Sequence, residues 1–101
     1  MDKFGLSDKT IKVITDLFKK YNQINKVIIF GSRARGNFKN SSDIDMAICG
    51  ENIDFKFIRH ISAELDELPT PYSFDVLNYS DVENNEIKTN IDEDGVIFYQ
   101  K

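Results

Sequence analysis

Residues 27–49 read VIIFGSRARGNFKNSSDIDMAIC, and this stretch decides the expected fold. Residues 27–30 form a short apolar run rich in β-branched side chains, which predicts a strand covered on both faces. Gly31 ends this run. Residues 32–35 suffice for about one helical turn, which Gly36 would stop because glycine is favoured just after a helix. The stretch therefore predicts a buried strand that leads into a tight turn.

A second strand is predicted over residues 43–49, after a polar, loop-like connection over residues 37–42. Its residues alternate in polarity, and successive side chains of a strand point to opposite faces of the sheet. We therefore expect Asp43 and Asp45 on one face. The opposite, apolar face takes Ile44, Met46 and Ile48.

The rest of the chain is predicted to build helices and further strands around this pair. Apolar residues recur at helical spacing in two segments, and two shorter apolar runs are typical of strands. The expected elements are helices over residues 7–21, 53–68 and 81–94 and strands over residues 72–77 and 96–99. This order predicts an α/β (α+β) fold, a small mixed β-sheet backed by helices, in a single domain over residues 1–101.

Composition narrows the class of protein. The chain has 101 residues, of which 41% are hydrophobic, so one core without disulfides is expected. A single cysteine, Cys49, excludes an intrachain disulfide and favours a cytoplasmic protein. We identify neither a signal peptide nor an apolar run of the roughly 20 residues that a transmembrane helix needs. The net charge of −4 argues against general nucleic-acid binding.

Three carboxylates are candidates for a metal site. Asp43 and Asp45 would repel each other on one strand face, and a divalent cation would relieve this repulsion. Asp75 lies within the apolar run of a later strand, where an unpaired acid is costly. Together the three acids predict a site for two magnesium ions of the kind used for displacement at phosphorus. The alternative is a solvated strand face, which an isolated pair of this spacing favours.

The turn after the first strand is a candidate phosphate site. Gly31 lets the backbone approach a ligand, and Ser32 stands where a helical turn begins with free N–H groups. Arg33 and Arg35 add planar donors suited to phosphate. A plain strand-to-helix turn would show the same Gly-Ser pair, so the turn gains meaning only from the acids that follow it.

In combination, these motifs resemble the signature of the DNA polymerase beta-like nucleotidyltransferase superfamily. The resemblance rests on Gly31-Ser32, on the segment Arg33–Gly36, on Ser42-Asp43-Ile44-Asp45 and, by context, on Asp75. Within the superfamily, the chain most resembles the minimal nucleotidyltransferase (MNT) proteins. The resemblance covers nearly the whole chain in the order of its elements, and its motif part spans residues 27–48.

The resemblance implies a reaction and roles for these residues. A hydroxyl would attack the α-phosphorus of a nucleoside triphosphate, ATP being the expected one, and pyrophosphate would leave. Asp43, Asp45 and Asp75 would be the catalytic, magnesium-binding acids, with Asp75 nearest the nucleophile. The nucleotide would be held by Gly31 and Ser32, with help from Arg33 or Arg35.

The resemblance also implies a partner. Larger members carry a second, usually helical domain, for which this chain leaves no room. Minimal members are commonly encoded beside a helical HEPN-type toxin, and the expected role is that of an antitoxin that adds AMP to a tyrosine of this toxin.

Two other functions stay open at this point: a module that neutralises a partner by contact alone, and a transferase to a small molecule such as an antibiotic. His60 is expected at the surface without a companion base or ligand, so it is not a candidate catalytic residue.

Overall fold

The structure is a computed structural model, and it describes residues 3–101. Its elements confirm a mixed α/β fold. In chain order they are α1 (Asp8–Lys19), β1 (Ile24–Phe30), α2 (Ser32–Arg35), β2 (Ile44–Gly50), α3 (Phe55–Glu67), β3 (Phe74–Asn78), the 3₁₀ turn η1 (Tyr79–Asp81), α4 (Asn85–Asp94) and β4 (Val96–Gln100). Within the described residues, no helix is both long and apolar enough to span a membrane.

Element boundaries differ from the sequence prediction at places that local hydrogen bonds explain. The last helix begins at Asn85 rather than at Asp81, because the Asn84 side chain accepts hydrogen bonds from the first-turn N–H groups. Likewise, α3 begins after Asp54, whose carboxylate accepts from the Phe57 N–H at 2.8 Å. The strands shift as well: β1 begins before the predicted start, at Ile24, and β2 begins one residue after Asp43.

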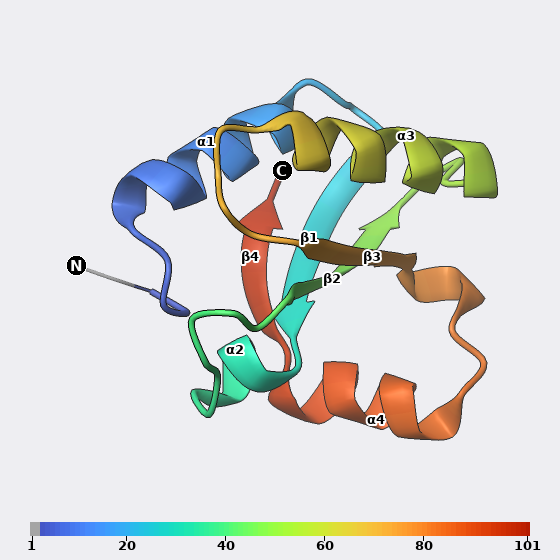
Figure 1. Ribbon diagram of the computed structural model, residues 1–101. Helices are drawn as coiled ribbons and strands as arrows, with labels where there is room; N and C mark the ends of the chain where they lie inside the picture. The colour runs from blue at the N-terminus through green and yellow to red at the C-terminus, as the bar shows by residue number, and fades with distance from the viewer. Residues whose placement is uncertain (1–2) are drawn as a thin grey trace.

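The four strands form one sheet in the order β3-β2-β1-β4. β1 is antiparallel to β2 and β4, whereas β2 and β3 are parallel, because α3 carries the chain back between them. Figure 1 shows the layers: α1 and α3 lie above the sheet, and α2 and α4 lie below it. The prediction of a mixed sheet backed by helices is therefore confirmed.

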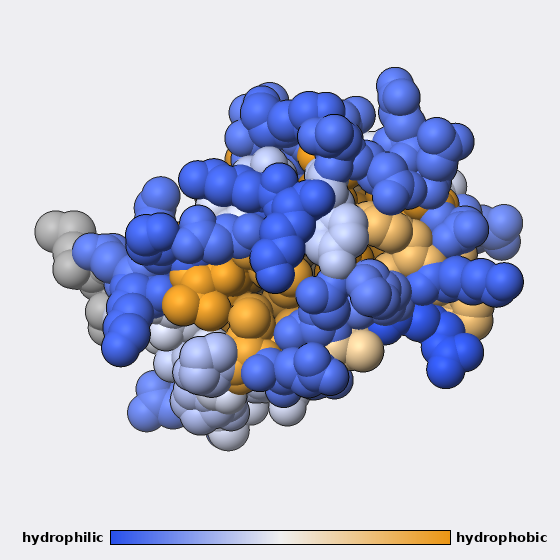
Figure 2. Space-filling model, turned by 90° about the horizontal axis from the view of Figure 1, so that it is seen from above, coloured by the Kyte–Doolittle hydropathy of each residue, from blue (hydrophilic) through white to orange (hydrophobic). Residues whose placement is uncertain are grey.

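The larger core lies between the sheet and the upper helices. The alternation predicted for residues 43–49 is observed here, since Ile44, Met46 and Ile48 are fully buried against α1 and α3. Below the sheet a smaller cluster joins Phe30, Ala47 and Ile91. Seen from above, the molecule is mostly hydrophilic, with hydrophobic residues exposed only in limited areas (Figure 2). The core therefore lies mainly on one face of the sheet, and the lower face is less covered.

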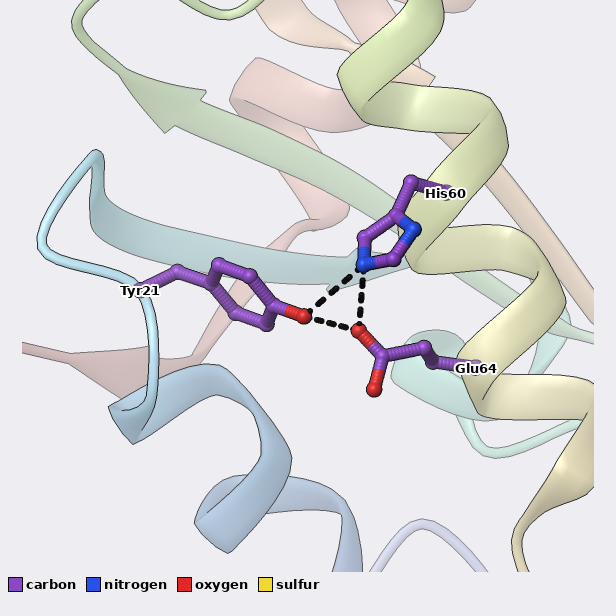
Figure 3. Close-up of polar contacts among 3 residues, drawn as sticks. All are labelled: Tyr21, His60 and Glu64. Atoms are coloured by element: carbon purple, nitrogen blue, oxygen red, sulfur yellow. Dashed lines mark hydrogen bonds and ion pairs between the residues drawn. The ribbon is translucent and has the colours of Figure 1, made fainter.

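A polar contact ties the end of α1 to α3 (Figure 3). The Tyr21 hydroxyl donates to the Glu64 carboxylate, and His60 Nε2 lies 3.0 Å from the hydroxyl and 2.8 Å from the carboxylate. His60 is exposed as expected, but the expectation that it has no companion group was wrong. That group is Glu64, one helical turn after His60. Its hydrogen bond with the Tyr21 hydroxyl raises the pKa of Tyr21 to about 12.

We predict that Tyr21→Phe lowers the free energy of unfolding by about 1 kcal/mol, because it removes this hydrogen bond and keeps the ring. Urea denaturation at pH 7.5 would measure the change. Tyr79→Phe is the matched control, because the Tyr79 hydroxyl bonds only to the exposed Asp92, and no measurable change is expected. Equal effects of the two substitutions would contradict a stabilising role for the Tyr21 contact.

Candidate functional site

The turn after β1 and the carboxylate of Asp45 lie against each other. Gly31 has φ +74°, and a Cβ atom placed there would come within 2.3 Å of Asp45 Oδ2. Any other residue would therefore be strained and would push the carboxylate away. The following residue, Ser32, is half-buried and begins α2. The predicted phosphate turn and one predicted metal ligand are thus direct neighbours.

Sheet register brings Asp75 to the same place. Asp45 on β2 and Asp75 on β3 are paired across the parallel strands, so their side chains emerge side by side on one face. Asp43 lies just before β2 rather than within it, and its charge still acts on Asp45. Both Asp43 and Asp75 are exposed. The sequence argument that an unpaired acid is costly at position 75 was wrong, because β3 is an edge strand and this carboxylate faces solvent.

Electrostatics single out Asp45 among the three acids. Partial burial, the charge of Asp75 and the charge of Asp43 raise the pKa of Asp45 to about 6, although the Arg35 charge lowers it. Like charges at an open sheet edge are therefore held close together. A bound cation would favour the ionised form of Asp45 and offset the repulsion.

The acids do not form a closed metal cage. Among residues 3–101, no three His, Cys, Asp or Glu side chains lie close enough together to hold a metal by themselves. Magnesium does not require such a cage, because it usually takes one or two carboxylates and completes its shell with water and substrate phosphates. The donor set of Asp43, Asp45 and Asp75 fits a magnesium ion that arrives with a nucleotide.

Arg33 is placed where it cannot reach a ligand without leaving its partners. Its side chain is only 2% exposed, and its guanidinium donates to the carbonyl oxygens of Phe4, Asn40 and Ser42 at 2.9–3.3 Å. The guanidinium also stacks between the rings of Phe38 and Tyr72. Arg33 thus holds the loop before β2 through hydrogen bonds. No pattern in the sequence predicted this structural role.

Arg35, in contrast, is free to meet a phosphate. Its side chain is 39% exposed, and its nearest anionic partner is Asp94 at the end of α4, 3.9 Å away. Its charge also acts on Asp45, which places it at the acid site. Of the two arginines predicted to help bind a nucleotide, Arg35 is the one that the structure leaves accessible beside the acids.

Comparison with known proteins supports the interpretation of these motifs. The family described as "Polymerase beta, Nucleotidyltransferase" matches residues 12–101. A Methanocaldococcus jannaschii protein named "Putative protein adenylyltransferase" is 40% identical over 60 residues. That alignment covers 57% of this chain and 59% of the relative, so less than two thirds of the relative's length is matched.

Solved structures share the fold. A mutant of the toxin–antitoxin complex MntA-HpeT matches with a TM-score of 0.72 and 15% identity, over 91% of this chain and 73% of the other. A complex of a tri-AMPylated Shewanella oneidensis HEPN toxin with an MNT antitoxin matches with a TM-score of 0.55 and 13% identity, over 90% and 73%. At these identities the similarity establishes the architecture, while the site must be argued from the residues.

The raised pKa of Asp45 predicts a pH dependence of stability in metal-free buffer. The folded-state pKa of about 6 exceeds the ordinary 3.8, so the unfolded chain releases this proton first and the free energy of unfolding falls as pH rises from about 4 to about 6. We expect Asp45→Asn to remove this fall and to be more stable than wild type at pH 7 by about 2 kcal/mol. Denaturation at a series of pH values would measure it.

The control is Asp66→Asn, which removes an exposed acid of α3 away from the site and should leave the pH profile of the wild type unchanged. A parallel profile for Asp45→Asn and wild type between pH 4 and 7 would contradict the repulsion described for the three acids.

The two arginines predict opposite phenotypes. Arg33→Ala leaves several carbonyl oxygens without a donor and should lower the free energy of unfolding by about 3 kcal/mol. Arg35→Ala removes an exposed side chain, so stability should stay within about 0.5 kcal/mol while ATP binding weakens. Denaturation and calorimetric titration with ATP would separate the two. Normal stability of Arg33→Ala would refute its structural role.

Proposed function

Because the chain belongs to the polymerase beta nucleotidyltransferase family, we propose that it transfers AMP from ATP to a hydroxyl group. The proposed acceptor is a tyrosine of a HEPN-type toxin, which makes this protein the antitoxin of a cytoplasmic pair. The observation that carries the proposal is the contact of Asp45 with the Gly31 turn, next to Asp75 on the adjacent strand. A turn suited to phosphate thus lies beside carboxylates suited to metal ions. A triphosphate with its metal ions would contact both.

The proposed reaction is an in-line displacement at phosphorus. The acceptor oxygen forms a bond to the α-phosphorus, the bond from that phosphorus to the bridging oxygen breaks, and pyrophosphate leaves with the electron pair. The hydroxyl proton passes to the Asp75 carboxylate, which is exposed and so accessible to an acceptor. The protein's part is positioning and charge compensation rather than covalent chemistry.

The residues divide this work between them. Gly31 and Ser32 bind the β- and γ-phosphates through the backbone N–H groups and the hydroxyl, and Arg35 supplies positive charge from an exposed position. Asp43, Asp45 and Asp75 would hold two magnesium ions. Such ions supply neutralisation of the phosphate charge that develops during transfer. Arg33 contributes indirectly, because it holds the loop that leads into Asp43.

The comparisons support AMP as the transferred group and a protein as the acceptor. The Methanocaldococcus jannaschii relative is named for protein adenylyl transfer, and the Shewanella oneidensis complex pairs an AMPylated HEPN toxin with its MNT antitoxin. The resemblance of Gly31-Ser32 and Asp43-Ile44-Asp45 to the minimal nucleotidyltransferases agrees with that choice. We propose the same kind of partner for this chain.

We predict that Asp43→Asn combined with Asp45→Asn lowers transfer by at least on the order of 100-fold, because it removes two carboxylates that would hold the magnesium ions, and these ions neutralise the phosphate charge. The assay uses α-labelled ATP, magnesium and the HEPN-type product of the neighbouring gene. Asp66→Asn serves as the matched control, since it removes one exposed acid of α3. Equal labelling of the partner by wild type and the double variant would refute the enzymatic proposal.

Growth of cells that express the partner distinguishes the remaining alternatives. If the double variant protects cells as well as wild type does, contact alone neutralises the partner. If label appears on free small hydroxyl compounds and not on the partner, the protein is a small-molecule transferase.

A further inference from the structure

A cavity of about 270 Å³ lies between the end of β3 and the start of α4. Its apolar wall consists of Leu77, Val82 and Ile87, and its rim is polar, with Asp81, Glu83 and Asn84. We propose that this cavity binds the aromatic ring of the acceptor tyrosine and thereby selects a phenol as the group that receives AMP. The inference rests on the proposed function and names the acceptor side of that same site.

The cavity has the size and chemistry for one aromatic ring. Apolar cavities of about 150 Å³ are large enough to bind benzene, and this one is larger. Three aliphatic side chains offer contact to both edges of a ring, while the polar rim suits the peptide backbone that carries it. Ile87 is 37% exposed at the start of an otherwise polar helix, so its apolar surface is available to a ligand.

The position of the cavity relative to Asp75 sets where a bound hydroxyl would lie. Leu77 follows Asp75 by two residues in β3, so both side chains emerge on the same face of the sheet. Two residues of a strand span about 7 Å. Leu77 and Val82 pack with the small cluster below the sheet, which confirms that the cavity opens on the face of the acids. A tyrosine ring that lies against Leu77 along the strand is therefore within reach of Asp75 with its hydroxyl.

The position of the cavity at β3 favours the acceptor over the nucleobase as its occupant. Across the sheet, the Gly31 turn follows β1, Asp45 lies on β2 and Asp75 lies on β3, and the cavity begins further along β3, at Leu77. In an in-line displacement the attacking and leaving oxygens stand on opposite sides of the phosphorus. If pyrophosphate leaves at the Gly31 turn, the attacking hydroxyl must enter from the side of β3. The cavity adjoins this side, because Leu77 and Asn78 of β3 belong to its lining.

A kinetic test introduces a carboxylate into the cavity and, as a control, a carboxylate at an exposed position outside it. Ile87→Asp should raise the KM for the HEPN-type acceptor about tenfold and leave the KM for ATP unchanged. The variant is expected to fold, because position 87 is exposed and an acid in the first turn of a helix interacts favourably with the helix dipole. Ile97→Asp is the matched control: this isoleucine is 49% exposed on β4, away from the cavity, and its acceptor KM should equal that of wild type.

A binding test uses a probe that needs no transfer. Titration with N-acetyl-tyrosinamide should shift the methyl NMR signals of Leu77, Val82 and Ile87, whereas N-acetyl-serinamide should not. Absence of these shifts, or the same shifts on adding ATP alone, overturns the assignment; the second outcome would make the cavity a nucleobase site.

The outcomes separate this inference from the proposed function. If wild type labels the partner and Ile87→Asp has the same acceptor KM as Ile97→Asp, only the cavity assignment fails. If wild type labels no tyrosine at all, the proposed function fails, and the titration still decides whether the cavity takes a phenol.

Discussion

The buried guanidinium of Arg33 is the interaction on which the site depends. It joins the carbonyl oxygens of Phe4, Asn40 and Ser42, which belong to the N-terminal segment and to the loop before β2. Arg33 itself belongs to α2, which begins directly after Gly31. Its side chain therefore links the Gly31 turn to the loop that leads into β2, the strand that carries Asp45. A buried charge is tolerated there because its donors are paired with carbonyl oxygens and its faces are covered by two aromatic rings. Preorganisation of the two halves of the site follows from that one residue.

The three acids at the site destabilise the ligand-free protein, because their charges repel one another. This repulsion is consistent with a binding function. Asp45 is half-buried beside the charges of Asp75 and Asp43, so its ionised form is disfavoured in the ligand-free protein. A fold selected only for stability would have no reason to place these groups together. Under the proposed function, bound cations would relieve this repulsion, and their binding energy would include that relief. The upper face of the sheet supplies the stability that makes this arrangement possible, since the larger core lies there.

Much of this architecture was predictable because it depends on local patterns. The alternation in residues 43–49 predicted which side chains of β2 form its apolar face, and Ile44, Met46 and Ile48 are fully buried there in the larger core. What could not be predicted depends on contacts between distant segments. The partners of Arg33 include Phe4 and Tyr72, which no spacing in the sequence connects to it. An unpaired acid at position 75 was expected to be costly because its neighbours are apolar, but strand order, which the local sequence does not encode, puts β3 at the edge, where Asp75 is exposed.

The unequal coverage of the two sheet faces explains why the reaction would take place where it does. Above the sheet, α1 and α3 bury one complete face (Figure 1). Below it, the ten-residue α4 covers Phe30 of β1 and Ala47 of β2 through Ile91, but Asp75 on the edge strand stays exposed. A macromolecular acceptor can approach an edge strand without displacing any element, whereas a site between two complete layers would require the protein to open. The sparse lower layer would therefore give the proposed protein acceptor access to the acids, and the ring of its side chain would pack against Leu77, which α4 leaves partly exposed.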